Sequence, residues 1–274
     1  MYINCKGQLI DLSVPKVMGI LNLTPDSFYD GGRRKNNEEH LHKVEEMLEE
    51  GADFIDMGSY SSRPGAQNIS EEEELQRLLP VVKEVVEKFP EVIISIDTFR
   101  SEIARQCVEA GAAIVNDISA GNLDEKMMKT VAQLQVPYIM MHMRGNPQNM
   151  KSLNQYDDLV QDILFYFSEK VDRARELGIN DLIIDPGFGF SKNIEQNFEL
   201  LSKLQLFQNL ELPVLAGLSR KSLIYKTFNT SPDEALNGTT VLNSVALMKG
   251  SHILRVHDVK EAVECVKLLQ HLQN

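Results

Sequence analysis

The sequence predicts a (β/α)₈ barrel, a ring of parallel strands each followed by a helix, with a short β-hairpin ahead of it. Eight short apolar runs of strand character recur along the 274 residues, and stretches with helical periodicity separate them. Several runs are continuously apolar, as expected of strands buried on both faces of a parallel sheet. Each run ends at a polar or charged residue, and barrels of this class gather such residues at one mouth, where their chemistry takes place. The pattern therefore predicts an enzyme.

The individual elements can be placed in chain order. Residues 2–12 alternate around Lys6-Gly7, which predicts the hairpin. Ser70 stands before four consecutive glutamates and predicts a helix start, since a hydroxyl cap and early carboxylates both stabilise a helix N-terminus. The last helix is expected to start after Asp258, and no linker divides the chain, so residues 1–274 are expected to form one domain. The strands are predicted at 17–23, 54–57, 92–96, 113–115, 138–141, 182–184, 214–218 and 253–256.

Charge and composition restrict the classes of partner. With 28 basic and 40 acidic side chains the formal net charge is −12, so a nucleic acid or an anionic membrane is not expected to bind. The amino terminus has no signal-peptide pattern, and no apolar stretch approaches the roughly 18 residues that a membrane span requires. Three scattered cysteines favour a reducing compartment, and we expect a cytoplasmic protein. An anionic small molecule remains a candidate ligand, because basic residues fall at predicted strand ends: Arg63, Arg144, Arg220, Lys221 and Arg255.

Other charged groups are interpreted as structural. The glutamate-rich tracts 45–50 and 71–74 have helical settings, which favours solvated outer faces over a metal site. His40, His42 and His271 are interpreted as surface helix residues, and His252 at a strand start is assigned to the rim of the barrel that carries no chemistry.

Four segments are too specific for a generic barrel. They are Gly19-Ile20-Leu21-Asn22-Leu23-Thr24-Pro25-Asp26-Ser27-Phe28, Ser61-Ser62-Arg63-Pro64-Gly65-Ala66, Asp185-Pro186-Gly187-Phe188-Gly189-Phe190 and Ser219-Arg220-Lys221-Ser222. With these motifs the chain resembles the dihydropteroate synthase family of pterin-binding barrels, from about Val17 to its end. The resemblance implies a Mg²⁺-dependent transferase of folate biosynthesis that joins a dihydropterin methyl diphosphate to 4-aminobenzoate and releases diphosphate. It also implies a homodimer and a sulfonamide target.

The donors and acceptors of several strand-end residues suit a pterin ring. A carboxylate accepts two bonds from adjacent N–H groups of the ring, and Asp185 is the candidate, although a turn aspartate at a strand end is the structural alternative. Asn116 offers a donor and an acceptor, but an asparagine can also end a strand through its own backbone bonds. Lys221 could reach the ring carbonyl, or be a solvated lysine at a helix start. The resemblance implies the full pterin set Asp97, Asn116, Ile118, Met140, Asp185, Gly217 and Lys221.

The leaving diphosphate requires positive charge and donors. Arg255 and His257 are two residues apart on one strand, so their side chains point to the same side. With Arg63 they predict an anion site, since arginine suits bidentate phosphate contacts. A core histidine is the alternative for His257. The diphosphate set is Asn22, Ser62, Arg63, Arg255 and His257, and by resemblance Asn22 also binds the Mg²⁺.

The resemblance places the arylamine beside the pterin methylene. Its set is Phe28, Pro64, Phe190, Ser219 and Ser222, with Phe190 as a core residue being the alternative. An SN1-like substitution through a dihydropterin methylene cation needs carboxylates rather than a general base, because the aryl amine is already neutral at pH 7. The residues assigned to catalysis are Asp97, Lys221, Asp26 and Arg63.

The second motif departs from the family pattern. Family members commonly have Gly-Glu-Ser-Thr-Arg-Pro there, and this chain has Tyr60 in place of the glutamate and Ser62 in place of the threonine. Competing interpretations are a corrinoid-dependent methyltransferase on the same barrel and a pterin-binding protein that has lost turnover. A dinucleotide-binding protein is poorly supported, because Lys192 stands where the third glycine of the fingerprint belongs.

Overall fold

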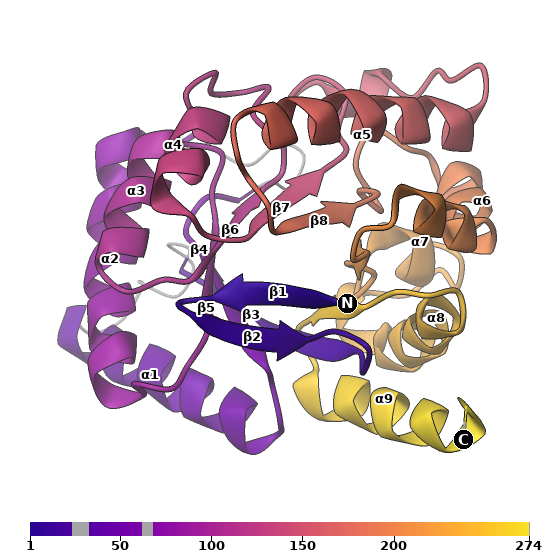
Figure 1. Ribbon diagram of the computed structural model, residues 1–274. Helices are drawn as coiled ribbons and strands as arrows, with labels where there is room; N and C mark the ends of the chain where they lie inside the picture. The colour runs from indigo at the N-terminus through magenta and orange to yellow at the C-terminus, as the bar shows by residue number, and fades with distance from the viewer. Residues whose placement is uncertain (24–32, 62–67, 274) are drawn as a thin grey trace.

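The computed structural model describes residues 1–23, 33–61 and 68–273, with the side chains of residues 33–36 and 273 left out of the description (Figure 1). Within these ranges no helix is long and apolar enough to cross a membrane. Cys5, Cys107 and Cys265 are all buried free thiols.

The central element is an eight-stranded parallel sheet with the order β8-β7-β6-β5-β4-β3-β10-β9. A parallel bridge between Ile184 and Val214 brings β8 and β9 together, so the sheet closes into the predicted barrel. The strands are β3 (Lys16–Asn22), β4 (Phe54–Gly58), β5 (Ile94–Asp97), β6 (Ile114–Asp117), β7 (Tyr138–Met141), β8 (Leu182–Asp185), β9 (Leu215–Ala216) and β10 (Ile253–Val256).

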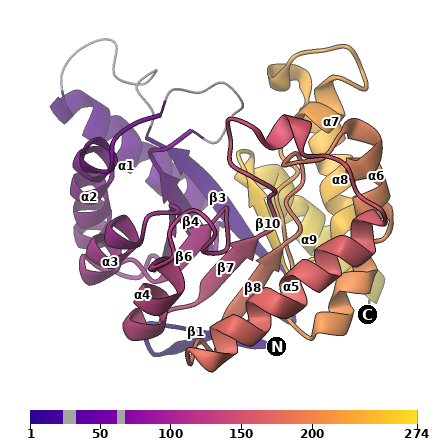
Figure 2. The ribbon, with the colours of Figure 1, turned by 90° about the horizontal axis from the view of Figure 1, so that it is seen from above.

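Helices surround this ring (Figures 1 and 2). Ser70 caps α2 as predicted, its side chain accepting a 3.1 Å bond from the Glu73 amide, and α9 starts directly after Asp258. The α-helices are α1 (Arg33–Glu49), α2 (Glu71–Lys88), α3 (Ser101–Glu109), α4 (Met127–Leu134), α5 (Leu159–Glu176), α6 (Ile194–Ser202), α7 (Ser222–Tyr225), α8 (Leu236–Met248) and α9 (Val259–Gln273). Short 3₁₀ turns are η2 (Met150–Ser152), η3 (Leu204–Leu210) and η4 (Pro232–Glu234).

The predicted hairpin is present and covers one end of the barrel. β1 (Tyr2–Cys5) and β2 (Gln8–Asp11) pair antiparallel and lie across the ring in Figure 1. Lys6 and Gly7 at the turn both have positive φ, at 53° and 83°. The apolar cluster beneath the hairpin joins it to the inside of the barrel, and its members include Ile3, Cys5, Leu12, Met18, Phe54, Ile114, Ile139, Ile183, Leu215 and Ile253.

Strand alternation divides the remaining side chains between two environments. The positions that alternate with the inward residues along each strand, such as Ile55 and Ile184, point outward. Their side chains belong to the larger apolar cluster between the strands and the helices. Every described element thus packs on this one barrel. That residues 1–274 form one domain stays a prediction.

The structure differs from the sequence-based expectation in several details. β9 covers only Leu215–Ala216 of the predicted 214–218, because Gly217 and Leu218 already leave the sheet. Glu74, predicted on a solvated face, is fully buried because Thr98 and Arg100 bind its carboxylate. His40 is also buried, at 7 % exposure, and is not the surface residue that was expected.

Candidate active site

Polar side chains occupy the inside of the barrel just beyond the apolar cluster. The inward position two residues after Phe54 is Asp56, two after Ile183 is Asp185, and two after Ile253 is Arg255. Because side chains two apart on a strand share a face, each strand changes from apolar to polar over about 7 Å. The carboxyl ends of the strands therefore form a charged mouth, as the sequence predicted.

Arg255 joins two of the carboxylates in this mouth. Its Nε donates to Asp56 Oδ2 over 2.6 Å, and its Nη2 donates to Asp97 Oδ2 over 2.6 Å. Asn116 Nδ2 donates to the same Asp56 oxygen over 3.1 Å. Burial raises the pKa of Asp97 to about 7; Arg255 opposes this shift and the negative charge of Asp56 adds to it. Arg255 thus offsets the charge of two carboxylates within the site.

Asp185 and Lys221 are a second pair of oppositely charged side chains in the mouth. Asp185 is buried, and its Oδ1 accepts a 2.8 Å bond from the Gly187 amide. Burial raises its pKa, and the nearby Lys221 opposes the shift. Burial also lowers the pKa of Lys221 to about 8, against the attraction of Asp185. Each group therefore lies close enough to favour the charged form of the other.

The chain turns sharply to aim Lys221 inward. Arg220 has a φ of 53° and pairs outward with Asp258 over 2.8 Å, while the next side chain enters the site. Lys221 Nζ donates to the Phe188 carbonyl and lies 4.8 Å from the centre of the Phe190 ring. A Cβ added at Gly217 would lie 3.6 Å from that nitrogen, so glycine leaves room beside it.

A further lysine, which sequence reasoning did not assign, supports the segment that carries Phe190. Lys192 Nζ donates 3.0 Å bonds to the carbonyls of Gly187 and Phe190, and it lies 3.1 Å from His142 Nδ1. Burial lowers the pKa of Lys192 to about 7 and the pKa of His142 well below its usual value. His142 is therefore a neutral acceptor for Lys192. The signal available in the sequence was a lysine two residues after a strand-end motif.

The ends of β9 and β10 also meet as predicted. Ser219 Oγ lies 3.0 Å from His257 Nδ1 and accepts a 3.2 Å bond from the His257 amide. Ser222 is the first residue of α7. Asn22 ends β3 opposite Gly58, and its side chain is exposed.

One predicted pterin residue is not brought to this mouth. Met140 is fully buried in the cluster between the strands and the helices. Met141 points the other way, because successive side chains of a strand alternate, and it packs with Ile118 and Phe190. The assignment of Met140 was therefore displaced by one residue. Five other predicted site residues lie outside the described residues, namely Asp26, Phe28, Ser62, Arg63 and Pro64.

Asp56 is the most central residue that sequence reasoning missed. It is fully buried and has three neighbours in the mouth, Arg255, Asn116 and, through Arg255, Asp97. The available signal was a carboxylate inside the apolar run Phe54-Ile55-Asp56-Met57, since buried carboxylates require partners.

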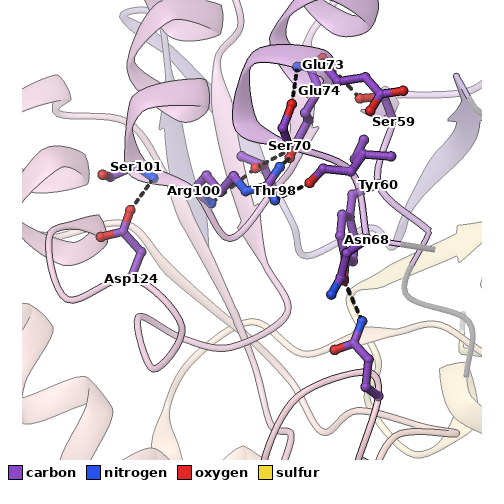
Figure 3. Close-up of polar contacts among 12 residues, drawn as sticks. Ser59, Tyr60, Asn68, Ser70, Glu73, Glu74, Thr98, Arg100, Ser101 and Asp124 are labelled. Carbon is purple, nitrogen blue, oxygen red and sulfur yellow. Dashed lines mark hydrogen bonds and ion pairs between the residues drawn. The ribbon is translucent and has the colours of Figure 1, made fainter. Parts of the chain in front are cut away.

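A second polar cluster lies beside the mouth and holds the ends of β4 and β5 (Figure 3). The buried Glu74 accepts from Thr98 Oγ1 over 2.7 Å and pairs with Arg100, whose Nη2 donates to the Ile69 carbonyl over 2.6 Å. Tyr60 stacks edge-on against Phe99 and donates a 2.6 Å bond to Asn68 Oδ1. In this chain Tyr60 thus fixes its position by an aromatic and a hydroxyl contact, without the carboxylate of the family pattern.

Known proteins are similar in sequence to this chain over nearly its whole length. The family model described as "Pterin binding enzyme" matches residues 18–257. The dihydropteroate synthase of Escherichia coli K12 is 43% identical over 267 residues, covering 97% of this chain and 94% of that protein.

Solved structures give the same result. The Yersinia pestis dihydropteroate synthase with a sulfonamide drug complex has a TM-score of 0.93 and 41% identity, covering 100% and 99% of the two chains. The Xanthomonas albilineans enzyme in complex with 7,8-dihydropteroate has a TM-score of 0.89 and 36% identity, covering 100% and 99%. The chain belongs to the dihydropteroate synthase family of pterin-binding enzymes.

Proposed function

We propose that the protein is a transferase that condenses (7,8-dihydropterin-6-yl)methyl diphosphate with 4-aminobenzoate, giving 7,8-dihydropteroate and diphosphate. The observation that carries the proposal is the mouth of the barrel, where Asp97, Asn116, Asp185 and Lys221 converge without a nucleophilic serine or cysteine among the described residues of this group. Such a group binds a flat heterocycle and stabilises charge, as a dissociative substitution requires.

The pterin ring is assigned to the buried groups. Asp185 accepts from the adjacent N–H groups of the ring, because Oδ1 accepts from the Gly187 amide while no described residue donates to Oδ2. Lys221 is assigned as the donor to the ring carbonyl. Asp97 lies where positive charge develops when diphosphate leaves, and Ile118, Met141 and Gly217 are the apolar and open positions around the ring.

The diphosphate is assigned to the rim of the barrel. Arg255 on β10 and His257 directly after the strand are two residues apart, and Arg63 and Ser62 complete the proposed anion site. Asn22 offers an exposed carboxamide oxygen at the end of β3, which suits Mg²⁺, an ion that takes few protein ligands and several phosphate oxygens. When bound, Mg²⁺ would neutralise charge on the leaving diphosphate.

The arylamine is assigned to the loops above the ring. Phe190, held by Lys192, would flank its ring, while Ser222 is the first residue of α7 and Ser219 precedes that helix. Pro64 and Phe28 are assigned to the same set by resemblance. In the reaction the C–O bond to diphosphate breaks and the methylene cation forms. The amine nitrogen then bonds to the methylene carbon, and the proton that it loses passes to the released diphosphate. Asp97, Asp185 and Asp26 offset the cation electrostatically.

Product formation tests this function directly. The purified protein is incubated with Mg²⁺, the dihydropterin diphosphate and 4-aminobenzoate, and dihydropteroate is detected by mass. We expect product above a Lys221→Ala control. Tight pterin binding without product would favour the alternative of a pterin-binding protein that has lost turnover.

We also propose that two copies of the chain associate through α8 and α9. These neighbouring helices expose large apolar side chains, with Val241 at 53%, Met248 at 65%, Leu268 at 68% and Leu272 at 79%. Large exposed apolar side chains on neighbouring helices are typical of interfaces. We expect a dimer mass in sedimentation analysis and a monomer for Met248→Glu; a monomeric wild-type protein contradicts this proposal.

A further inference from the structure

Asp56 has no part in the reaction assigned above, although it lies among the groups that face the ring. Its side chain is fully buried on β4. One oxygen, Oδ2, accepts from both Arg255 Nε at 2.6 Å and Asn116 Nδ2 at 3.1 Å. The other, Oδ1, is buried with no hydrogen-bond partner among the described residues. A buried carboxylate with an unused oxygen is costly, so its two contacts must matter to the site.

In the hydrogen bond between Asp56 and Asn116, Asn116 is the donor and Asp56 is the acceptor. A carboxylate accepts hydrogen bonds and donates none, whereas a carboxamide has an NH₂ group on one side and an oxygen on the other. Asn116 must therefore turn its NH₂ group toward Asp56, and its carbonyl oxygen is directed away from that carboxylate. In this orientation Asn116 is an acceptor for a ligand, and its donor side is no longer available.

The contact with Arg255 also restricts one neighbour. Because Nε is bound to Asp56, the planar guanidinium presents Nη2 to Asp97, at 2.6 Å. Through these two contacts Asp56 joins β4 to β6 and β10. A displacement of Asp56 would release both Asn116 and Arg255.

We propose that Asp56 is a positioning residue that determines how the ring is recognised: it forces Asn116 to act as a hydrogen-bond acceptor and holds Arg255 against Asp97. The proposal rests on the pterin function given above and deepens it. It requires the bound ring to present an N–H donor to Asn116, and it explains why β4 carries a carboxylate inside an apolar run.

The first test compares two substitutions of Asp56 by calorimetric titration with a hydroxymethyl dihydropterin. Asp56→Asn keeps an oxygen for both donors, so affinity should stay within about threefold, whereas Asp56→Ala should lose about 30-fold or more, since it leaves two buried donors unpaired. The KM for 4-aminobenzoate should not change in either variant. Equal losses for the two variants would overturn the positioning role and indicate that the charge itself is needed.

The second test reverses the polarity of the pair and does not depend on Asp56→Ala being folded. Asn116→Asp places two carboxylates together and should abolish binding. The double variant Asp56→Asn, Asn116→Asp restores one donor and one carboxylate, so affinity should recover to within about tenfold of the wild type. Failure of the double variant to recover, with both proteins folded by circular dichroism, would refute the proposal.

Titration of the wild-type protein with the dihydropterin distinguishes a failure of the proposed function from a failure of the role of Asp56. If the unaltered protein does not bind the dihydropterin, the proposed function fails. If it binds and the swapped variant does not recover, only the role of Asp56 fails.

Discussion

The two ends of the barrel use the same strands for opposite purposes. At the hairpin end the inward side chains are Phe54, Ile183 and Ile253, packed under Leu12 in a cluster of apolar residues. Two residues further along the same strands stand Asp56, Asp185 and Arg255. Figure 2 shows the hairpin at one end of the strands and α7 at the other. The apolar end keeps the ring rigid, and that rigidity holds the costly charges of the mouth in place.

The comparison implies that changes at the mouth affect binding more than stability. The largest effect is expected for Asp185→Ala, because the adjacent N–H donors of the ring would lose a buried charged acceptor. We expect at least about a 1,000-fold loss of dihydropterin affinity by calorimetry, on the order of 4 kcal/mol. Unchanged pterin affinity would refute the assignment of Asp185.

At the hairpin end the expected pattern is reversed. Leu12 is fully buried, and Leu12→Ala removes its side chain from the cluster under the hairpin. The free energy of unfolding should fall by about 3 kcal/mol in urea denaturation, while KM values at low temperature stay unchanged. A raised KM with no loss of stability would show that the two ends are not separable.

The ionisation of Asp97 and Lys221 in the mouth predicts how kcat/KM depends on pH. Asp97 has a pKa of about 7 and Lys221 one of about 8, so the carboxylate and the ammonium are both charged only in a narrow range. kcat/KM should fall below pH 7 as Asp97 takes up a proton, and above pH 8 as Lys221 loses one, by about tenfold at pH 9. Lys221→Arg should remove the alkaline fall, since arginine stays charged; an identical fall in that variant assigns it to another group.

The smallest effect is expected at the rim near the hairpin. His252 Nδ1 accepts a 3.1 Å bond from the Val214 amide, and burial lowers its pKa, so the ring is a neutral acceptor. His252→Ala should lower the unfolding free energy by about 1 kcal/mol in thermal or urea denaturation. Its kcat should equal that of the wild type, and a clear drop in kcat would contradict a structural role.

Much of the site could be predicted from the chain because strand ends carry a local signal. Asp97, Asn116, Asp185 and Arg255 each follow an apolar run, and a parallel barrel brings such positions together whatever the intervening helices contain. Asp56 and Lys192 carried no comparable signal, because one lies within a strand and the other after a loop. Arg255 is far from Asp56 in sequence, and His142 is far from Lys192.

By itself the sequence determined the alternation of strands and helices, the hairpin, the capped start of α2, and the polar residues at the strand ends, because these depend on local periodicity and residue type. Tertiary structure decided which face of each strand points inward, so that Met141 rather than Met140 lies at the mouth. It also decided that Glu74 is buried and that Arg255 lies between Asp56 and Asp97. These outcomes depend on closure of the ring, since only closure brings side chains from distant strands within hydrogen-bonding distance.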